Sequence, residues 1–184
     1  HVATDGIITT VAGNYQYSSP TIDEIPATQA SLSPTLGLEL GPDGSLYIAD
    51  SQNGRVRKVT KDGIIHTIAG GGPGGLGDGG LATQARLLPN SVALAPDGSL
   101  YIADVLYIDG SYGRIRRIST DGIISTVAGG NPYSSSAGSA DNIPASQAHM
   151  SEPQHVEVAP DGSVYIAHNH RVSKISTDGI IHRF

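Results

Sequence analysis

Short apolar runs, separated by Asp-Gly pairs, follow one another from one end of the chain to the other. A typical run is Leu46-Tyr47-Ile48-Ala49, and β-branched and aromatic residues of this kind favour strands over helices. An Asp-Gly pair between two such runs is typical of a tight hairpin turn, because glycine accepts the positive φ that the turn needs. The pattern therefore predicts short antiparallel strands joined by hairpins.

The same pattern of strands and turns recurs along the chain. The segment that begins at Pro42-Asp43-Gly44 is repeated from Pro96 and from Pro160, and an Arg-hydrophobic segment follows each copy. The segment Asp-Gly-Ile-Ile occurs at residues 5–8, 62–65, 121–124 and 178–181. Tandem units of four short strands are typical of propeller blades. The sequence therefore predicts an all-β fold made of β-propeller blades.

We expect one propeller segment over residues 1–184, with three four-stranded antiparallel blades. The blades are expected at about residues 36–69, 92–128 and 155–184, with long loops before them at 14–35, 71–90 and 130–154. Residues 7–12 match the last strand of a blade and are expected to form an extra leading strand. Each loop ends in Ala-Thr/Ser-Gln-Ala, which predicts one turn of helix that packs Leu32, Leu87 or Met150 inward.

Three blades are too few to close a disc, since propellers usually have about four to eight. Open ends leave unpaired strand edges and apolar faces, which favour association. The chain is then either a fragment of a longer propeller or half of a six-bladed ring formed by two chains. We expect the homodimeric ring, in which residues 7–12 could complete the partner's last blade in competition with residues 180–184.

The charge and the composition exclude several classes of function. Asp and Glu number 17 against 11 Lys and Arg, and the net charge is −6. A nucleic-acid partner is not expected, because such proteins usually carry a basic face. There is no cysteine, which excludes disulfides, thiolate metal sites and a cysteine nucleophile. No apolar run reaches the length of a membrane-spanning helix, so insertion into a membrane is not expected.

The sharpest metal-like pattern is the pair His168 and His170, because alternating histidines on a strand can share one face and bind a metal. His170, however, lies in the ordinary turn of the repeat, and the first two blades have no equivalent histidine. A structural role is therefore favoured for both. We predict no catalytic residue and no cofactor, with Ca²⁺ or Zn²⁺ as the alternative.

A carboxylate ends the second strand of the first two blades, at Asp50 and Asp104. An arginine follows each across the next turn, at Arg55 and Arg114. We predict a carboxylate–guanidinium bridge across each turn, with a structural role, because no partner for acid–base catalysis accompanies it.

Tyrosines and serines are concentrated in the variable halves of the long loops and in the neighbouring turns. In a propeller the connections between blades cross one face of the disc, and binding groups gather on loops that a rigid scaffold holds. Tyrosine suits recognition because it offers a large, rigid contact area. The candidate binding residues on this face are Tyr15, Tyr17, Tyr107, Tyr112 and Tyr133.

The run Pro-Asp-Gly-Ser-Leu-Tyr-Ile-Ala-Asp, a short turn and Arg-hydrophobic-Arg resemble the NHL repeat. The turn Asn169-His170-Arg171-Val172 resembles the turn that gives this repeat its name. The longer motif, which includes Gly77-Asp78-Gly79-Gly80, is similar to the NHL propellers of large bacterial surface proteins and of teneurins and Rhs-type (YD-repeat) proteins. The resemblance covers essentially the whole chain, and it implies more about the fold than about the function.

The resemblance implies an extracellular or cell-surface location within a larger bacterial protein. NHL propellers mostly bind proteins, while some bind RNA and a few are lyases or lactonases. We therefore predict a non-enzymatic protein-interaction or scaffold module, with recognition on the face that carries the long loops. The alternatives are a lyase- or lactonase-like enzyme with a metal in the central channel, and carbohydrate binding by the Tyr- and Ser-bearing loops.

Overall fold

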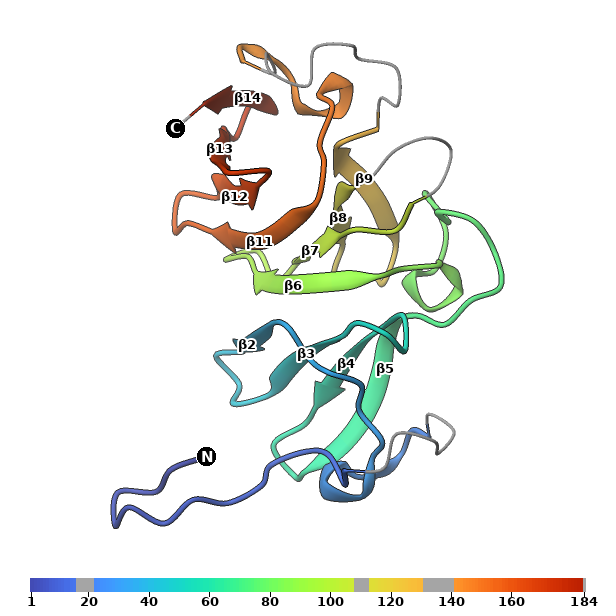
Figure 1. The fold of residues 1–184 in the computed structure, drawn as a ribbon, viewed down its shortest axis with the longest axis vertical. Helices are drawn as coiled ribbons and strands as arrows, with labels where there is room; N and C mark the ends of the chain where they lie inside the picture. Colours follow the sequence, from blue (N-terminus) through green and yellow to red (C-terminus); the bar gives the residue numbers. More distant parts are fainter. Residues whose placement is uncertain (16–21, 108–112, 131–140, 184) are drawn as a thin grey trace.

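Three antiparallel sheets follow one another along the chain in the computed structural model (Figure 1), which describes residues 1–15, 22–107, 113–130 and 141–183. Within each sheet the four main strands are adjacent in chain order, as successive hairpins. The predicted all-β fold of four-stranded antiparallel units is thereby confirmed. Among the described residues, no helix has both the length and the apolar character needed to cross a membrane.

We call the three sheets blade 1, blade 2 and blade 3. Blade 1 contains β2 (Leu38–Leu40), β3 (Leu46–Asp50), β4 (Arg55–Val59) and β5 (Ile64–Gly70), with β1 (Ile25–Pro26) paired to the outer edge of β5. Blade 2 contains β6 (Pro89–Leu94), β7 (Leu100–Asp104), β8 (Arg114–Ile118) and β9 (Ile124–Ala128). Blade 3 contains β11 (Pro153–Val158), β12 (Val164–His168), β13 (Arg171–Ile175) and β14 (Ile180–Arg183), with β10 (Ile143–Pro144) paired to β14.

The structure corrects the expectation of an extra leading strand. Residues 7–12 form no strand, and the only pairing in this segment is an isolated bridge between Val2 and Ile8. The apolar side chains of Ile7, Ile8 and Val11 are exposed. A strand in this position needs the rest of a blade to pair with, and among the described residues nothing supplies it.

The outer edge of each blade carries a short pairing that the sequence pattern does not reveal. The long loop that precedes a blade returns to the last strand of that blade, where β1 pairs with β5 and β10 pairs with β14. In blade 2 the same contact is the isolated bridge between Leu81 and Ile123. Each long loop is therefore attached to the outer strand of the blade that it leads into.

A single turn of 3-10 helix closes each long loop, at η1 (Ala27–Gln29), η2 (Ala82–Gln84) and η3 (Ala145–Gln147). The predicted helical turn is therefore tighter and shorter than an α-helix. The alanine that begins each turn and the alanine that follows it are buried, and so are Leu87 and Met150, whereas Leu32 is only half-buried. The motif Ala-Thr/Ser-Gln-Ala thus packs the loop against its blade with small side chains.

Asp-Gly hairpin turns lie at one end of every sheet. In the turn before β7, the Asp97 carboxylate accepts hydrogen bonds from the backbone N–H and the hydroxyl of Ser99. These bonds, with the nearby Arg117, lower the pKa of Asp97 to about 2. Gly98 takes the positive φ of the turn. Asp43 and Asp161 receive the same two bonds from Ser45 and Ser163, so the turn is built identically in all three blades.

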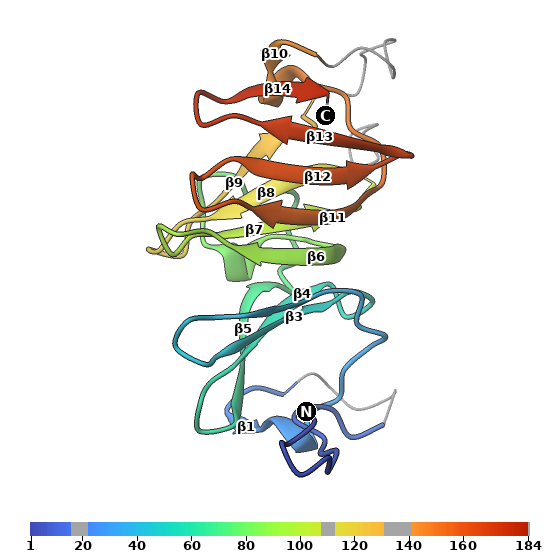
Figure 2. The same cartoon turned by 90° about the vertical axis from the view of Figure 1, so that its left-hand side faces the viewer.

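The other end of every sheet carries the long loops and the turns between second and third strands, and we call it the loop end. The register shows this in blade 2, where Asp104 lies opposite both Pro89 and Arg114, so the start of β6, the end of β7 and the start of β8 coincide. Figure 2 shows the β11–β12 and β13–β14 turns on one side of blade 3 and the β12–β13 turn on the other.

Adjacent blades pack face to face, and the two faces of a blade differ. The face toward the following blade, which we call the trailing face, carries Ala49, Val56 and Ala69 in blade 1 and Ala103, Ile115 and Ala128 in blade 2. The face toward the preceding blade, the leading face, carries larger residues: Ile48, Val59 and Ile65; Ile102, Ile118 and Ile124; Ile166, Ile175 and Ile181. A trailing face and a leading face together enclose each of the two cores between blades.

Two glycines of blade 1 have the same backbone conformation but different surroundings, so they distinguish the cost of a positive φ from the cost of a steric clash. Gly63 and Gly70 both have a φ of 82°, but a Cβ at Gly63 would meet nothing within 4 Å, whereas a Cβ at Gly70 would lie 2.0 Å from the Gly54 oxygen. We expect Gly63→Ala to lower the free energy of unfolding by about 1–2 kcal/mol through the left-handed conformation alone. Gly70→Ala should lower it by about 1–3 kcal/mol more. Equal losses in urea unfolding would contradict this account.

Candidate functional site

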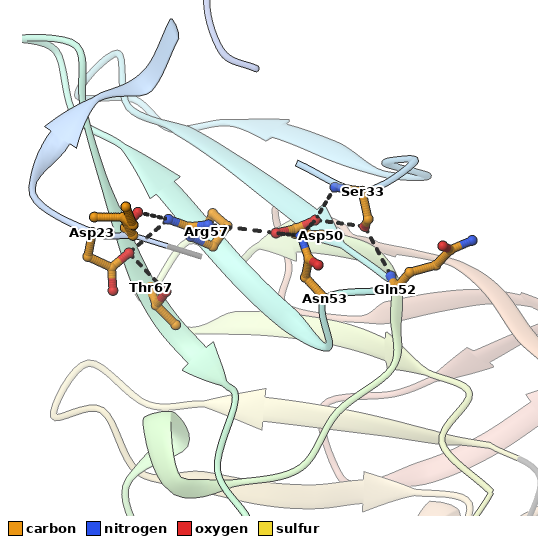
Figure 3. A network of polar contacts seen from close by, with 8 residues as sticks. Asp23, Ser33, Asp50, Gln52, Asn53, Arg57 and Thr67 are labelled. Carbon is orange, nitrogen blue, oxygen red and sulfur yellow. Dashed lines mark hydrogen bonds and ion pairs between the residues drawn. The ribbon is translucent and has the colours of Figure 1, made fainter. Parts of the chain in front are cut away.

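A buried ion pair connects the second and third strands of blade 1 (Figure 3). Asp50 ends β3, Arg57 lies in the middle of β4, and both side chains are fully buried. Arg57 Nη1 lies 3.7 Å from Asp50 Oδ2. Arg57 Nη1 and Nε make no hydrogen bond within the described part of the chain, so the contact with Asp50 is an attraction between charges rather than a hydrogen bond.

This pair holds both ends of the first long loop. Arg57 Nη2 donates to the Ile22 carbonyl oxygen at 2.9 Å and to Asp23 Oδ1 at 2.8 Å. Asp50 Oδ1 accepts from the Ser33 backbone N–H at 2.8 Å and from the Ser33 hydroxyl at 2.7 Å (Figure 3). Ile22 and Asp23 precede η1 and Ser33 follows it, so one ion pair ties the entry of the loop to its exit.

Blade 2 repeats the arrangement. Arg116 Nη1 lies 3.5 Å from Asp104 Oδ2, and both side chains are fully buried. Arg116 Nη2 donates to the Leu76 carbonyl oxygen at 2.7 Å and to Asp78 Oδ1 at 2.8 Å. Asp104 Oδ1 accepts from the Leu88 N–H at 2.9 Å on the far side of η2. The second long loop is therefore held at the same two points as the first.

Burial dominates the electrostatics of the second pair. Desolvation raises the pKa of Asp104, although the N–H groups of Leu88 and Leu106 and the charges of Arg116 and Arg114 oppose this rise. A buried carboxylate needs such compensation, because an isolated charge in an apolar interior is strongly unfavourable. The pair thus forms hydrogen bonds with groups of the second long loop, and its role is to position that loop.

The predicted bridge between Asp50 and Arg55 is wrong, because the guanidinium within ion-pair distance of Asp50 belongs to Arg57. Arg55 lies directly opposite Asp50 in the strand register, but its guanidinium is beside Gly71, where a Cβ would lie 2.6 Å from Arg55 Nε. In blade 2 the ion pair of Asp104 is likewise with Arg116, while Arg114 acts on Asp104 through its charge.

The repeat itself contains a signal for the correct partner. In blade 3 the aspartate is replaced by His168, and the arginine equivalent to Arg57 and Arg116 is replaced by Ser173. The arginine equivalent to Arg55 is retained as Arg171. The two residues that change together are the two that pair, and comparison of the three blades at these positions identifies them.

The substituted residues of blade 3 form their own contact. His168 Nε2 lies 2.9 Å from Ser173 Oγ, within hydrogen-bonding distance. Burial lowers the pKa of His168, and the charges of Arg171 and His149 lower it further. The neutral pair therefore replaces the ionic one. Of the two predicted metal-ligand candidates, His168 is half-buried against Ser173 and His170 is exposed. Among the described residues, no three His, Asp or Glu side chains are grouped as metal ligands.

A hollow of about 410 Å³ lies at the loop end of blade 3. It is lined by Glu152, Gln154 and the residues from Ala167 to Val172. Glu152, Asn169 and His170 have positive φ. Polar and charged side chains therefore surround a shallow space at the position where blades 1 and 2 have their arginine-bearing turns.

The structure describes two of the five candidate binding tyrosines. Tyr15 is 87% exposed and Tyr107 is 60% exposed. Tyr15 follows the leading segment and Tyr107 lies in the turn after β7, so both belong to the loop end. Tyr17, Tyr112 and Tyr133 lie outside the described residues.

The amino-acid sequence is similar to short segments of teneurins. Teneurin-m of Drosophila melanogaster is 28% identical over 198 residues, which cover 97% of this chain and 6% of that protein. Teneurin-3 of Danio rerio is 31% identical over 151 residues, 72% of this chain and 5% of that protein. The chain thus spans about one-twentieth of the length of these curated relatives. No protein-family model matches the chain.

Solved structures share the arrangement of the blades. Virginiamycin B lyase from Staphylococcus aureus aligns with a TM-score of 0.54 and 19% identity over 100% of this chain and 46% of its own. A gluconolactonase from Xanthomonas campestris aligns with a TM-score of 0.58 and 16% identity over 83% of this chain and 48% of its own. The fold is that of a β-propeller. At these identities the likeness shows the fold alone, and three blades correspond to nearly half of each solved chain.

The pairing of Asp50 with Arg57 can be tested by transplanting the residues of blade 3 into blade 1. We expect Asp50→His or Arg57→Ser alone to lower the free energy of unfolding by about 2–4 kcal/mol, because each removes the fully buried opposite charge, while Asp23 still binds Arg57 and Ser33 still binds Asp50. The double variant should be less destabilised than the sum of the two by at least about 1.5 kcal/mol. Asp50→His with Arg55→Ser serves as the matched control, and strict additivity of Asp50→His and Arg57→Ser would contradict the pairing.

The stability should also depend on pH through His168. Because folding lowers the pKa of His168 below its ordinary value of 6.5, the unfolded chain takes up the proton first as the pH falls. The contribution of His168 is therefore complete above pH 6.5 and is lost as the pH decreases toward its folded pKa. Urea unfolding at a series of pH values should show a smaller slope between pH 7 and 5 for His168→Gln than for the unsubstituted chain. Identical slopes would refute this role of His168.

Proposed function

We propose that this chain is a non-enzymatic interaction module, built from NHL-type blades, that acts outside the cell or at its surface. Its recognition surface is the loop end, and its partner is a protein. The observation that carries this proposal is that the loop end combines buried groups that fix the loops with exposed groups that can bind a partner. Buried charges fix both ends of the first two long loops, while Tyr15 and Tyr107 stay exposed.

The buried polar residues support binding rather than catalysis. Asp50 and Asp104 have their oxygens directed to arginines and to backbone N–H groups of the loops. A catalytic carboxylate needs access to the proton that it transfers. The repeated polar groups of blades 1 and 2 instead hold the backbone, and a rigidly held loop loses less conformational entropy when it binds.

The exposed tyrosines supply the contact area. Aromatic side chains dominate the energetics of many protein interfaces, because they bury a large surface with few rotatable bonds. The hollow beside His168 adds polar and charged groups to the same end of the molecule. A protein surface with a protruding apolar or polar side chain would fit this combination.

The location outside the cell is proposed from the likeness to teneurin segments and from the resemblance to NHL propellers of surface proteins. A lyase- or lactonase-like activity remains the alternative, on the same fold as the two solved enzymes. At identities of 19% and 16%, the likeness to these enzymes supports a shared fold and gives no information about a shared active site.

Saturable binding of the fluorescently labelled chain to intact animal and bacterial cells tests the proposal. We expect Tyr15→Ser with Tyr107→Ser to weaken the binding at least about tenfold, because interface tyrosines often act as hot spots. The matched control is Lys61→Ser with Thr120→Ala at the hairpin end, which should bind like the unsubstituted chain. An equal effect of both pairs, or metal-dependent turnover of a lactone by the purified chain, would refute the proposal.

A further inference from the structure

The turn between β3 and β4 contains the one Asn-Gly pair in the sequence, Asn53-Gly54. Asn53 Nδ2 lies 3.0 Å from both Asp50 Oδ1 and Asp50 Oδ2 and donates to them (Figure 3). Asn53 is half-buried, and Asp50 is fully buried. The Asn53 amide is therefore one of the neutral groups that compensate the buried carboxylate.

The fold requires both residue types in this order, for separate reasons. An amide NH2 group has two N–H donors and no charge, so Asn53 donates to both oxygens of Asp50. Gly54 has a φ of 63°, which favours glycine, and a Cβ there would lie 2.9 Å from the Leu87 oxygen. The buried carboxylate thus favours the asparagine, and the junction between blades 1 and 2 requires the glycine.

An asparagine that precedes a glycine is chemically reactive, because glycine has no side chain to hinder the approach of its own backbone nitrogen to the asparagine Cγ. We propose that Asn53 is a site of spontaneous deamidation, and that this modification releases the exit of the first long loop from blade 1. The inference rests on the contacts among Asn53, Asp50 and Ser33 and is independent of the proposed function.

The reaction needs no partner other than water. The Gly54 nitrogen attacks Asn53 Cγ, the bond from Cγ to Nδ2 breaks, and ammonia leaves with the proton from the Gly54 nitrogen. The product of this step is a five-membered cyclic imide. Water then adds to one of its two carbonyl carbons and opens the ring, which gives an aspartate or an isoaspartate at position 53. A neutral hydrogen-bond donor is thereby converted into a carboxylate.

The turn controls the rate of this reaction. The Gly54 N–H donates to the Ser51 carbonyl oxygen at 2.8 Å, and the Asn53 amide is held by Asp50. Both groups must leave these partners before the Gly54 nitrogen reaches Asn53 Cγ. Deamidation therefore proceeds from a locally opened turn, and its rate depends on the free energy of that opening.

The modified side chain does not replace Asn53 in its contacts. A carboxylate has no N–H to donate, and its negative charge would lie beside the buried charge of Asp50. The same Asp50 Oδ1 accepts from the Ser33 N–H and hydroxyl, and the Gln52 N–H donates to Ser33 Oγ at 3.0 Å. Repulsion at Asp50 therefore loosens Ser33, at the exit of the first long loop, together with the turn itself.

Peptide mapping by mass spectrometry during incubation at mildly alkaline pH tests the reaction. We expect aspartate and isoaspartate to accumulate at position 53, and denaturing urea to accelerate this conversion about tenfold to hundredfold, because the opened turn gives up hydrogen bonds to a charged group. In urea, Asn169, which precedes His170 in the corresponding turn of blade 3, should convert more slowly than Asn53. Equal rates at Asn53 with and without urea, a slowing in the folded chain far beyond this range, or an equal rate at Asn169 in urea would each overturn the inference.

The consequence for the loop is tested by Asn53→Asp, which introduces the charge of the product, with Asn53→Gln as the matched neutral control. Asp50 raises the pKa of the introduced carboxyl, so stability is kept below the ordinary pKa of about 3.9 and is lost as the pH rises through the raised pKa. At about pH 7, Asn53→Asp should therefore lower the folding equilibrium constant at least about tenfold more than Asn53→Gln.

Urea unfolding of both variants at a series of pH values measures this difference, which should decrease toward about pH 3 as the introduced carboxyl is protonated. Hydrogen exchange at the Ser33 and Gln52 N–H groups should be faster in Asn53→Asp than in Asn53→Gln, because both groups depend on the contacts of Asp50. Equal stability of the two variants at about pH 7, or equal exchange at Ser33, would contradict the release of the loop.

Discussion

The buried carboxylate–guanidinium pair is the interaction on which the loop end of blades 1 and 2 depends. Neither charge has access to water, so each needs partners other than the opposite charge. The available partners are backbone groups and short polar side chains of the long loop, on one side of the 3-10 turn for arginine and on the other for aspartate. The requirement to compensate two buried charges is thus what fixes the described ends of these loops.

Blade 3 shows that the same place can be filled without ions. His168 and Ser173 form a neutral contact. The loop before blade 3 keeps the outer-edge pairing that the other blades also have, through β10, and the Arg183 N–H donates to Asp141 Oδ1. Because an imidazole can accept a proton where a buried ion pair is already charged, this change places a titratable histidine in blade 3 at the position of the ion pair. It also leaves the hollow beside His168 at the loop end of that blade.

The packing between adjacent blades is the same at both junctions. A trailing face lined by alanines receives a leading face with larger β-branched residues, and neither face is covered by its own sheet. Within the described residues, the core residues of blade 2 are covered on both faces, while Leu38 and Leu40 of blade 1 and Val172 of blade 3 are exposed.

The sequence by itself determined the four main strands of each blade, the hairpin turns, the threefold repeat and the propeller fold, because these features rest on local patterns that recur within a few residues. Only the tertiary structure decided that Asp50 pairs with Arg57 and not with Arg55, since the direction of a side chain across a strand depends on what buries it. It also decided that residues 7–12 form no strand and that β1 and β10 extend the outer edges. A strand exists only where a neighbour accepts its hydrogen bonds, and that neighbour is supplied by the assembled fold rather than by the local sequence.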